Sequence, residues 1–137
     1  MRRGSRRDAP QVEALLGRAP GGASERRCRR LLGGLGADVY LAESSRGDLI
    51  GLVSLAYARS LVRDGLAAVL DGVHARQEPA APLLDGLIAF AEERARRRGC
   101  RHVLAWVEPG DTALVAALRA RAYRGREILV TELNEVA

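Results

Sequence analysis

The sequence contains no lysine, and this absence changes the meaning of its positive charge. All 22 basic residues are arginine, and against 17 acidic residues they give a formal net charge of +5. Such a charge is compatible with nucleic-acid binding, but a genome-wide codon bias explains the exclusive use of arginine more simply. Aromatic residues make up only 4% of the chain, too few for the stacking platforms of single-strand binders. Because the arginines are also spread along every predicted element, we do not expect a nucleic-acid partner.

Cysteines and long apolar runs are also scarce. The two cysteines, Cys28 and Cys100, have no C-x-x-C spacing and no ligand cluster beside them, which argues against a zinc or other metal site and against a disulfide scaffold. No segment approaches the ~18 consecutive apolar residues of a membrane span. The arginine-rich start is not followed by the apolar core of a signal peptide. We therefore expect a cytoplasmic protein without a membrane partner.

The length and composition fit one domain covering residues 1–137. Hydrophobic residues account for 47% of the chain and charged residues for 28%, the balance of an ordinary globular protein. A chain of this size buries one core and has no room for a second. We expect the domain to stand alone or as a small oligomer such as a homodimer.

Helical and strand patterns alternate in the first half of the chain. Asp8 and Pro10 are suited to open a helix that continues to Leu16, and a second helix is predicted over residues 24–32. From Asp38 the period changes to two, on both sides of the polar turn at residues 44–48. This pattern predicts an antiparallel hairpin, followed by a polar connection over residues 59–65.

The second half predicts a strand, a helix and a strand in succession. Residues 66–73 form a short apolar run that we expect near the centre of a sheet, residues 83–98 have helical periodicity, and residues 102–107 are again apolar. Such a sequence forms a right-handed parallel crossover. A last helix capped by Asp111 and a terminal strand at residues 128–130 complete the prediction.

This order of elements resembles that of the GNAT superfamily of acyl-CoA-dependent N-acyltransferases. Residues 3–16 resemble its opening strand and first helix, residues 39–43 and 49–53 its next two strands, and residues 91–100 its central crossover. The resemblance implies an α/β fold with a mixed, mostly antiparallel sheet flanked by helices around a central parallel strand–helix–strand unit. It also implies transfer of an acetyl or other acyl group from acyl-CoA to an amine of a small molecule or protein.

In typical members of that superfamily a loop of pattern R/Q-x-x-G-x-G/A binds the pyrophosphate of acetyl-CoA through backbone N–H groups at a helix N-terminus. Residues 73–82 correspond to this loop. Here Glu78 falls near the first glycine position, and Pro79 and Pro82 remove two N–H donors, so the resemblance implies a weakened loop. The cofactor-binding residues it implies are Val73, Ala75, Arg76, Gln77, Ala80, Ala81 and Asp111.

The second superfamily signature is a tyrosine that protonates the departing thiolate. When Ala122 and Tyr123 are aligned with the usual Gly-Phe pair, Leu118 occupies the position of that tyrosine. The usual general acid is therefore absent, and Tyr123 fills the aromatic packing position.

Four polar residues are further candidates for the site. Asp71, within the fourth strand, corresponds to the carboxylate that acts as a base in some members, although it could equally face solvent. His74 is either a base or an ordinary surface residue. Glu43 and Tyr57 either line the acceptor pocket or are simply polar ends of hairpin strands.

The remaining reactive or large side chains have ordinary interpretations. Cys100 and Trp106 are predicted to be core residues. The arginines around Cys28 could lower the pKa of its thiol. The rival hypothesis to catalysis is a degenerate GNAT-like domain that serves as a binding or assembly module, and Glu78 and Leu118 favour it.

Overall fold

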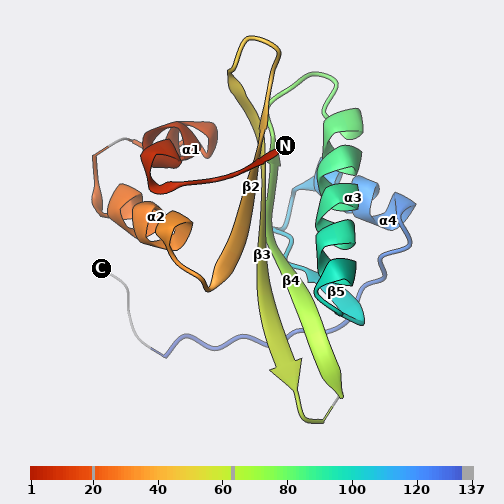
Figure 1. Ribbon diagram of the computed structural model, residues 1–137. Coiled ribbons are helices and arrows are strands. Elements are labelled where there is room, and N and C mark those ends of the chain that lie inside the picture. Colours follow the sequence, from red (N-terminus) through yellow and green to blue (C-terminus); the bar gives the residue numbers. More distant parts are fainter. Residues whose placement is uncertain (20, 63, 134–137) are drawn as a thin grey trace.

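The computed structural model describes residues 1–19, 21–62 and 64–133. From residue 9 to residue 120 its helices and strands follow the order that the sequence pattern predicts (Figure 1). In chain order they are β1 (Arg2–Arg3), the 3₁₀ helix η1 (Arg6–Asp8), α1 (Ala9–Leu15), α2 (Ala23–Gly33), β2 (Ala37–Glu43), β3 (Leu49–Ser60), β4 (Gly65–Ala75), α3 (Ala81–Arg97), β5 (His102–Ala105) and α4 (Thr112–Ala120).

The strands form a five-stranded sheet in the order β1-β2-β3-β4-β5. Every neighbouring pair is antiparallel except β4 and β5, which are parallel and joined through α3. Figure 1 shows α1 and α2 on one face of the sheet and α3 and α4 on the other. The predicted α/β class, with a mostly antiparallel sheet and one parallel crossover, is confirmed.

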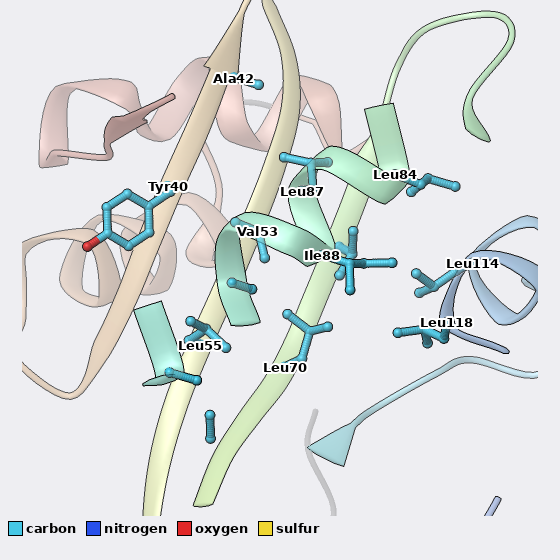
Figure 2. Close-up of a cluster of buried hydrophobic side chains, with 14 residues drawn as sticks. Tyr40, Ala42, Val53, Leu55, Leu70, Leu84, Leu87, Ile88, Leu114 and Leu118 are labelled. Carbon is cyan, nitrogen blue, oxygen red and sulfur yellow. The ribbon is translucent and has the colours of Figure 1, made fainter. Parts of the chain in front are cut away.

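The larger of the two hydrophobic cores lies between the sheet and α3 and α4 (Figure 2). α3 contributes apolar residues at helical spacing, and its charged residues face outward because they cannot share that stripe. Gly51 on β3 lets the helix approach closely, since a Cβ there would lie 3.2 Å from Leu87 Cδ1. The buried members are Tyr40, Ala42, Val53, Leu55, Ala68, Leu70, Val73, Leu84, Leu87, Ile88, Ala91, Ala95, Leu114 and Leu118.

A smaller core lies on the opposite face, under α1 and α2. Its buried members are Val12, Leu15, Val39, Leu41 and Leu52. The residues of β2 alternate between the two cores because successive side chains of a strand point to opposite faces. The sequence pattern of period two is thus used on both sides of the sheet.

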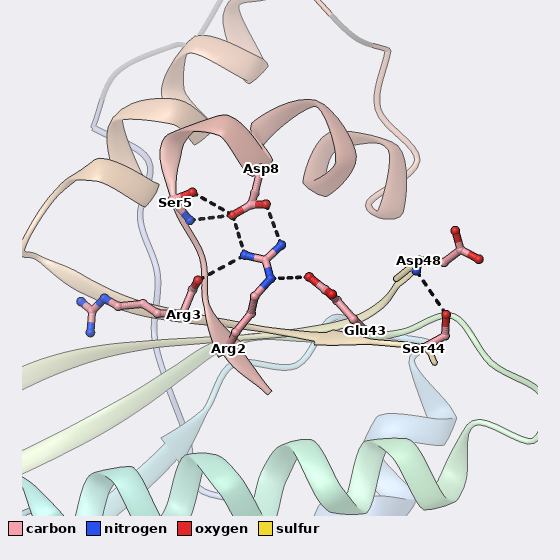
Figure 3. Close-up of polar contacts among 7 residues, drawn as sticks. All are labelled: Arg2, Arg3, Ser5, Asp8, Glu43, Ser44 and Asp48. Carbon is pink, nitrogen blue, oxygen red and sulfur yellow. Dashed lines mark hydrogen bonds and ion pairs between the residues drawn. The ribbon is translucent and has the colours of Figure 1, made fainter. Parts of the chain in front are cut away.

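Polar contacts hold the first residues of the chain to this sheet (Figure 3). The Arg2 guanidinium donates to both carboxylate oxygens of Asp8, at 2.9 and 2.8 Å, and its Nε donates to Glu43. Asp8 also accepts from the backbone N–H of Ser5 at 2.8 Å. These hydrogen bonds from Arg2 foremost, then from Ser5, outweigh the effect of burial and hold the pKa of Asp8 well below its ordinary value.

Ser54 is a buried polar residue of β3 whose hydroxyl has no hydrogen-bond partner among the described residues. Burying an unpaired hydroxyl destabilises a protein, so its removal should cost little. We expect Ser54→Ala to leave the free energy of unfolding unchanged or to raise it by up to about 1 kcal/mol. Urea denaturation measures the change.

Ser44→Ala is the matched control for this substitution, because the Ser44 hydroxyl accepts from the backbone N–H groups of Arg46 and Asp48. We expect the control to lose about 0.5–1 kcal/mol. A loss at Ser54 larger than the loss at Ser44 would contradict the assignment of an unpaired hydroxyl.

Three sequence predictions need correction. Residues 128–130 are not a strand: Ile128, Leu129 and Val130 have strand-forming side chains, but no neighbouring strand pairs with them within residues 1–19, 21–62 and 64–133. The two ends of the polar connection predicted at residues 59–65 are strand, because β3 and β4 pair as far as Ser60 and Gly65. Arg63 lies outside the described residues. β5 ends at Ala105 instead of residue 107, where its pairing with β4 ends.

Candidate active site between two diverging strands

The parallel strands β4 and β5 separate partway along their length. They are paired from Ala67 opposite His102 to Leu70 opposite Ala105, and the Trp106 N–H donates a final hydrogen bond to the Leu70 carbonyl at 3.0 Å. Beyond this point β4 continues to Ala75, whereas the segment that follows β5 turns away from it. A cleft of about 410 Å³ opens there, a volume typical of small-molecule sites.

Both diverging segments and the start of α4 line the cleft. The lining residues are Asp71, Gly72, Val73, His74, Trp106, Val107, Glu108, Asp111 and Leu114. The structure thus brings together Asp71, Val73 and Asp111, three of the residues predicted for the site, with His74.

A β-bulge in β4 orients the first of these residues. Leu55 of β3 is opposite Leu70 and Ser54 is opposite Gly72, so Asp71 is an extra residue in the ladder. The extra residue changes which residues face the larger core: Leu70 does so before the bulge and Val73 after it. Bulges of this kind often redirect side chains near active sites, and here Asp71 is left exposed at the mouth of the cleft.

Sequence reasoning missed five of the lining residues, namely Gly72, Trp106, Val107, Glu108 and Leu114. Glu108 lies three residues beyond the end of β5 and was predicted only to end the strand. Trp106 was predicted to be core, and this prediction is wrong because its side chain is 60% exposed. The reason is its position just past the last pair of β4 and β5 residues, where no strand covers it in the described part of the chain. Termination of the apolar run at Glu108-Pro109-Gly110 was the available signal.

The residues predicted for the cofactor loop divide into those at the cleft and those beyond it. Ala75, Arg76 and Gln77 are not among the lining residues; the Arg76 side chain instead donates to the Ala14 carbonyl at 2.7 Å, at the end of α1. Ala80 is the N-cap of α3 and Ala81 is its first residue.

The N-terminus of α3 lies at the same end of the sheet as the C-terminus of β4 (Figure 1). The first α-helical hydrogen bond of α3 is donated by the N–H of Leu84 to the carbonyl of Ala80. The N–H groups of Ala81 and Leu83 precede it and are therefore free of helical partners, whereas Pro82 has no N–H. The first turn carries no acidic side chain, so its positive end is available to an anion.

Asp111 opens α4 as predicted. Its Oδ1 accepts from the backbone N–H of Leu114 at 3.2 Å, which satisfies one of the free donors of the first turn. Further along this helix, Leu118 is buried against α3, so no phenol occupies that position. Tyr123 lies away from the cleft, and burial, followed by the nearby Glu92 carboxylate, raises the pKa of its hydroxyl.

The two candidates for an acceptor pocket are engaged elsewhere. Glu43 is paired with Arg2, and the Tyr57 hydroxyl donates to Asp38 at 2.7 Å. Burial alone would raise the pKa of Asp38, but the hydrogen bond from Tyr57 and the charges of Arg3 and Arg98 outweigh it, and the pKa is lowered overall. Neither Glu43 nor Tyr57 lines the cleft between β4 and β5.

Neither cysteine has the lowered pKa that favours a reactive thiolate. Burial, followed by the Glu13 carboxylate, raises the pKa of Cys28, so the prediction of a lowered value is wrong. Glu13 is fully buried beside it, where it accepts from Ser24 Oγ at 2.6 Å. Cys100 packs against the larger core, as predicted, and burial raises its pKa as well.

The described part of the chain offers neither a metal-binding cluster nor a membrane-spanning helix. No group of three or more His, Cys, Asp or Glu side chains there could hold a metal ion. Among the same residues, no helix has the length and apolar character needed to cross a membrane.

Comparison of the chain with known proteins gives matches at the level of structure. No family model matches it, and no curated protein matches its sequence significantly. Its structure is similar to a ribosomal-protein-alanine N-acetyltransferase from Brucella melitensis biovar Abortus 2308, with a TM-score of 0.76, 16% identity and coverage of 96% of this chain and 95% of that one. An aminoglycoside antibiotic 6′-N-acetyltransferase from Acinetobacter baumannii also gives 0.76, with 16% identity and coverage of 98% and 97%.

A third similar structure carries a different description. It is a transcriptional regulator from Bacillus halodurans C-125, with a TM-score of 0.82, 16% identity and coverage of 96% of this chain and 97% of that one. At such identities the likeness is one of fold. The sheet order, the parallel crossover through α3 and these matches together show that the chain has a GNAT-type fold.

Proposed function

We propose that the protein is an acyl-CoA-dependent N-acyltransferase whose acceptor is an amine of a small molecule or protein. The observation that carries this proposal is the cleft between β4 and β5, which opens beyond Leu70 and Ala105 at the end of the sheet where α3 begins. Such a cleft accepts an elongated ligand between two strands while the helix N-terminus offers N–H donors to its phosphates. The acetyltransferases of similar fold support the same assignment.

The chain's residues fit acyl-CoA in part. The N–H groups of Ala81 and Leu83 would bind its pyrophosphate, and the unpaired edge of β4 beyond Leu70 would contact the arm that carries the thioester. When bound, acyl-CoA supplies an activated acyl group with a thiolate as the leaving group. Because Pro82 has no N–H and Arg76 is engaged with Ala14, fewer donors face the phosphates than in the superfamily pattern, and the affinity should be modest.

In this proposal Asp71 accepts the proton of the acceptor amine. It lies at the bulge, is exposed and lines the cleft. With Leu118 in place of the usual tyrosine, solvent would protonate the thiolate. Catalysis would then depend mainly on holding the two substrates in line.

The alternative function is a binding or assembly module without catalysis. It is favoured by the three carboxylates that line the cleft, those of Asp71, Glu108 and Asp111. These charges oppose an anionic ligand, whereas a bound cation or a protein partner would tolerate them. A turnover assay with acetyl-CoA and a panel of amines separates the two functions: acyl transfer supports the enzyme, and binding of acetyl-CoA without transfer supports the module.

A single substitution at the start of α3 tests the phosphate site. Ala81 is exposed, so Ala81→Asp adds a negative charge where it stabilises the helix but repels phosphate. We expect the affinity for acetyl-CoA, measured by isothermal titration, to fall about tenfold, while the thermal midpoint does not fall. Ala81→Asn is the neutral control and should retain most of the affinity.

Two outcomes would contradict the proposal. One is the absence of heat when the unaltered protein is titrated with millimolar acetyl-CoA. The other is equal affinity of the aspartate and asparagine variants, which would place the phosphates away from α3.

A further inference from the structure

Residues 124–133 form an exposed segment after α4, here termed the C-terminal segment. Every residue in it is exposed, and Leu129 and Val130 have exposed fractions of 86% and 73%. In Figure 1 it passes from the α4 side of the sheet toward the α2 side. An apolar run of this kind is a ready partner for another strand.

The pattern of side chains in this segment is self-complementary when it is extended. Alternation places Arg126, Ile128, Val130 and Glu132 on one face, with two apolar residues between opposite charges. The other face has Leu129 at its centre. Reversing the direction of such a strand leaves its apolar residues aligned and exchanges the positions of its charges.

We propose that the C-terminal segments of two copies of this chain pair as antiparallel strands across a twofold axis at Leu129. In this register Ile128 of one copy lies opposite Val130 of the other, and Arg126 lies opposite Glu132. The ion pair occurs twice because the interface is isologous. A shift of one residue in one direction would place Glu127 opposite Glu132, a pair of like charges that destabilises a ladder. A shift in the other direction would place Arg126 opposite Thr131 and lose the ion pair.

The edge of β5 supplies the support that such a ribbon needs. A two-stranded ribbon alone is marginally stable in water. β5 pairs with β4 on one side, and the described part of the chain provides no strand on its other side. Trp106, at its end, is also largely exposed. The paired segments would therefore extend the sheets of both copies.

Charge reversal tests the register directly, with the dissociation constant of the dimer measured by analytical ultracentrifugation of the full chain. We expect the unaltered protein to form a dimer, and Arg126→Glu and Glu132→Arg each to weaken it at least about tenfold. The double variant restores the opposite charges and should regain most of the affinity. Arg46→Glu, in the exposed turn between β2 and β3, makes the same charge change elsewhere and should have no effect.

Cross-linking provides a second measurement that does not depend on affinity. With Cys28 and Cys100 replaced by serine, Leu129→Cys should form a disulfide-linked dimer on mild oxidation, because residues opposite each other have Cα atoms about 5 Å apart. Thr131→Cys should not, since four residues of strand separate the two copies of position 131 by roughly 13 Å.

Each contrary result overturns the proposal. A protein that stays monomeric at high concentration shows that the segment does not join two copies, for example because it adds to β5 of its own chain. A dimer that resists both charge reversals, or that cross-links equally well at positions 129 and 131, uses another surface or register.

Discussion

Leu70→Ala is expected to lower the free energy of unfolding by about 3 kcal/mol, because removal of a buried leucine costs its transfer energy and leaves a cavity. Leu70 is 1% exposed and belongs to the larger core. Its backbone carbonyl also accepts the last hydrogen bond before the two strands separate. Chemical denaturation followed by circular dichroism measures the change. The substitution should also weaken any binding in the cleft, since the wall formed by β4 starts at the next residue, Asp71.

Leu61→Ala is the matched control, because the same atoms are removed from a residue that is 98% exposed in the connection between β3 and β4. We expect the control to change the stability by less than about 0.5 kcal/mol. A loss at Leu70 no larger than the loss at Leu61 would show that the larger core does not depend on this side chain.

The second large effect is a loss of stability in acid. The pKa values of Asp8 and Asp38 are lowered in the folded protein, whereas unfolded aspartate titrates near pH ~4. A group with a depressed folded pKa contributes stability that is fully present above the unfolded pKa and is lost as the pH falls through the folded pKa. The free energy of unfolding should therefore be level near neutral pH and should decrease below about pH 5.

Asp8→Asn removes part of this dependence. We expect it to cost about 2 kcal/mol at pH 7, a value reduced by solvent around the partly exposed Arg2. The cost should shrink as the pH falls below ~4, because protonation of Asp8 in the unfolded chain then destabilises the unaltered protein, whereas the asparagine variant has no proton to take up. Asp48→Asn is the control, since Asp48 is exposed and its hydrogen bond to Ser44 uses the backbone N–H. Parallel pH curves for the Asp8 variant and the unaltered protein would contradict the assignment.

The fold could be predicted from the sequence where a pattern repeats over several turns or pairs. α3 is the clearest example, since Leu84, Leu87 and Ile88 mark its buried stripe and Gly99 its end. The hairpin of β2 and β3 could be predicted for the same reason. The segment at residues 128–130 could not, because strand propensity measures fit to a neighbouring strand and says nothing of whether one is present.

The site could be predicted only in part. Asp71 and Asp111 were identified through the resemblance, and both line the cleft. Trp106 and Glu108 were missed because their exposure depends on where two strands stop pairing, a long-range feature that neither residue signals locally. Arg76 was predicted to bind the cofactor, but its side chain contacts the Ala14 carbonyl. This partner is 62 residues away in the chain, so the contact is also a long-range feature.

The early separation of β4 from β5 has an energetic consequence for any ligand that enters between them. The two strands are paired over only four residues each, and the bulge at Asp71 already holds the longer strand in its diverged path. The conformational entropy of these two segments is already lost when the chain folds. A ligand therefore does not have to break hydrogen bonds between the strands, and little of its binding free energy is used to open the cleft. The cleft is preorganised, and its backbone should move little between the free and occupied states.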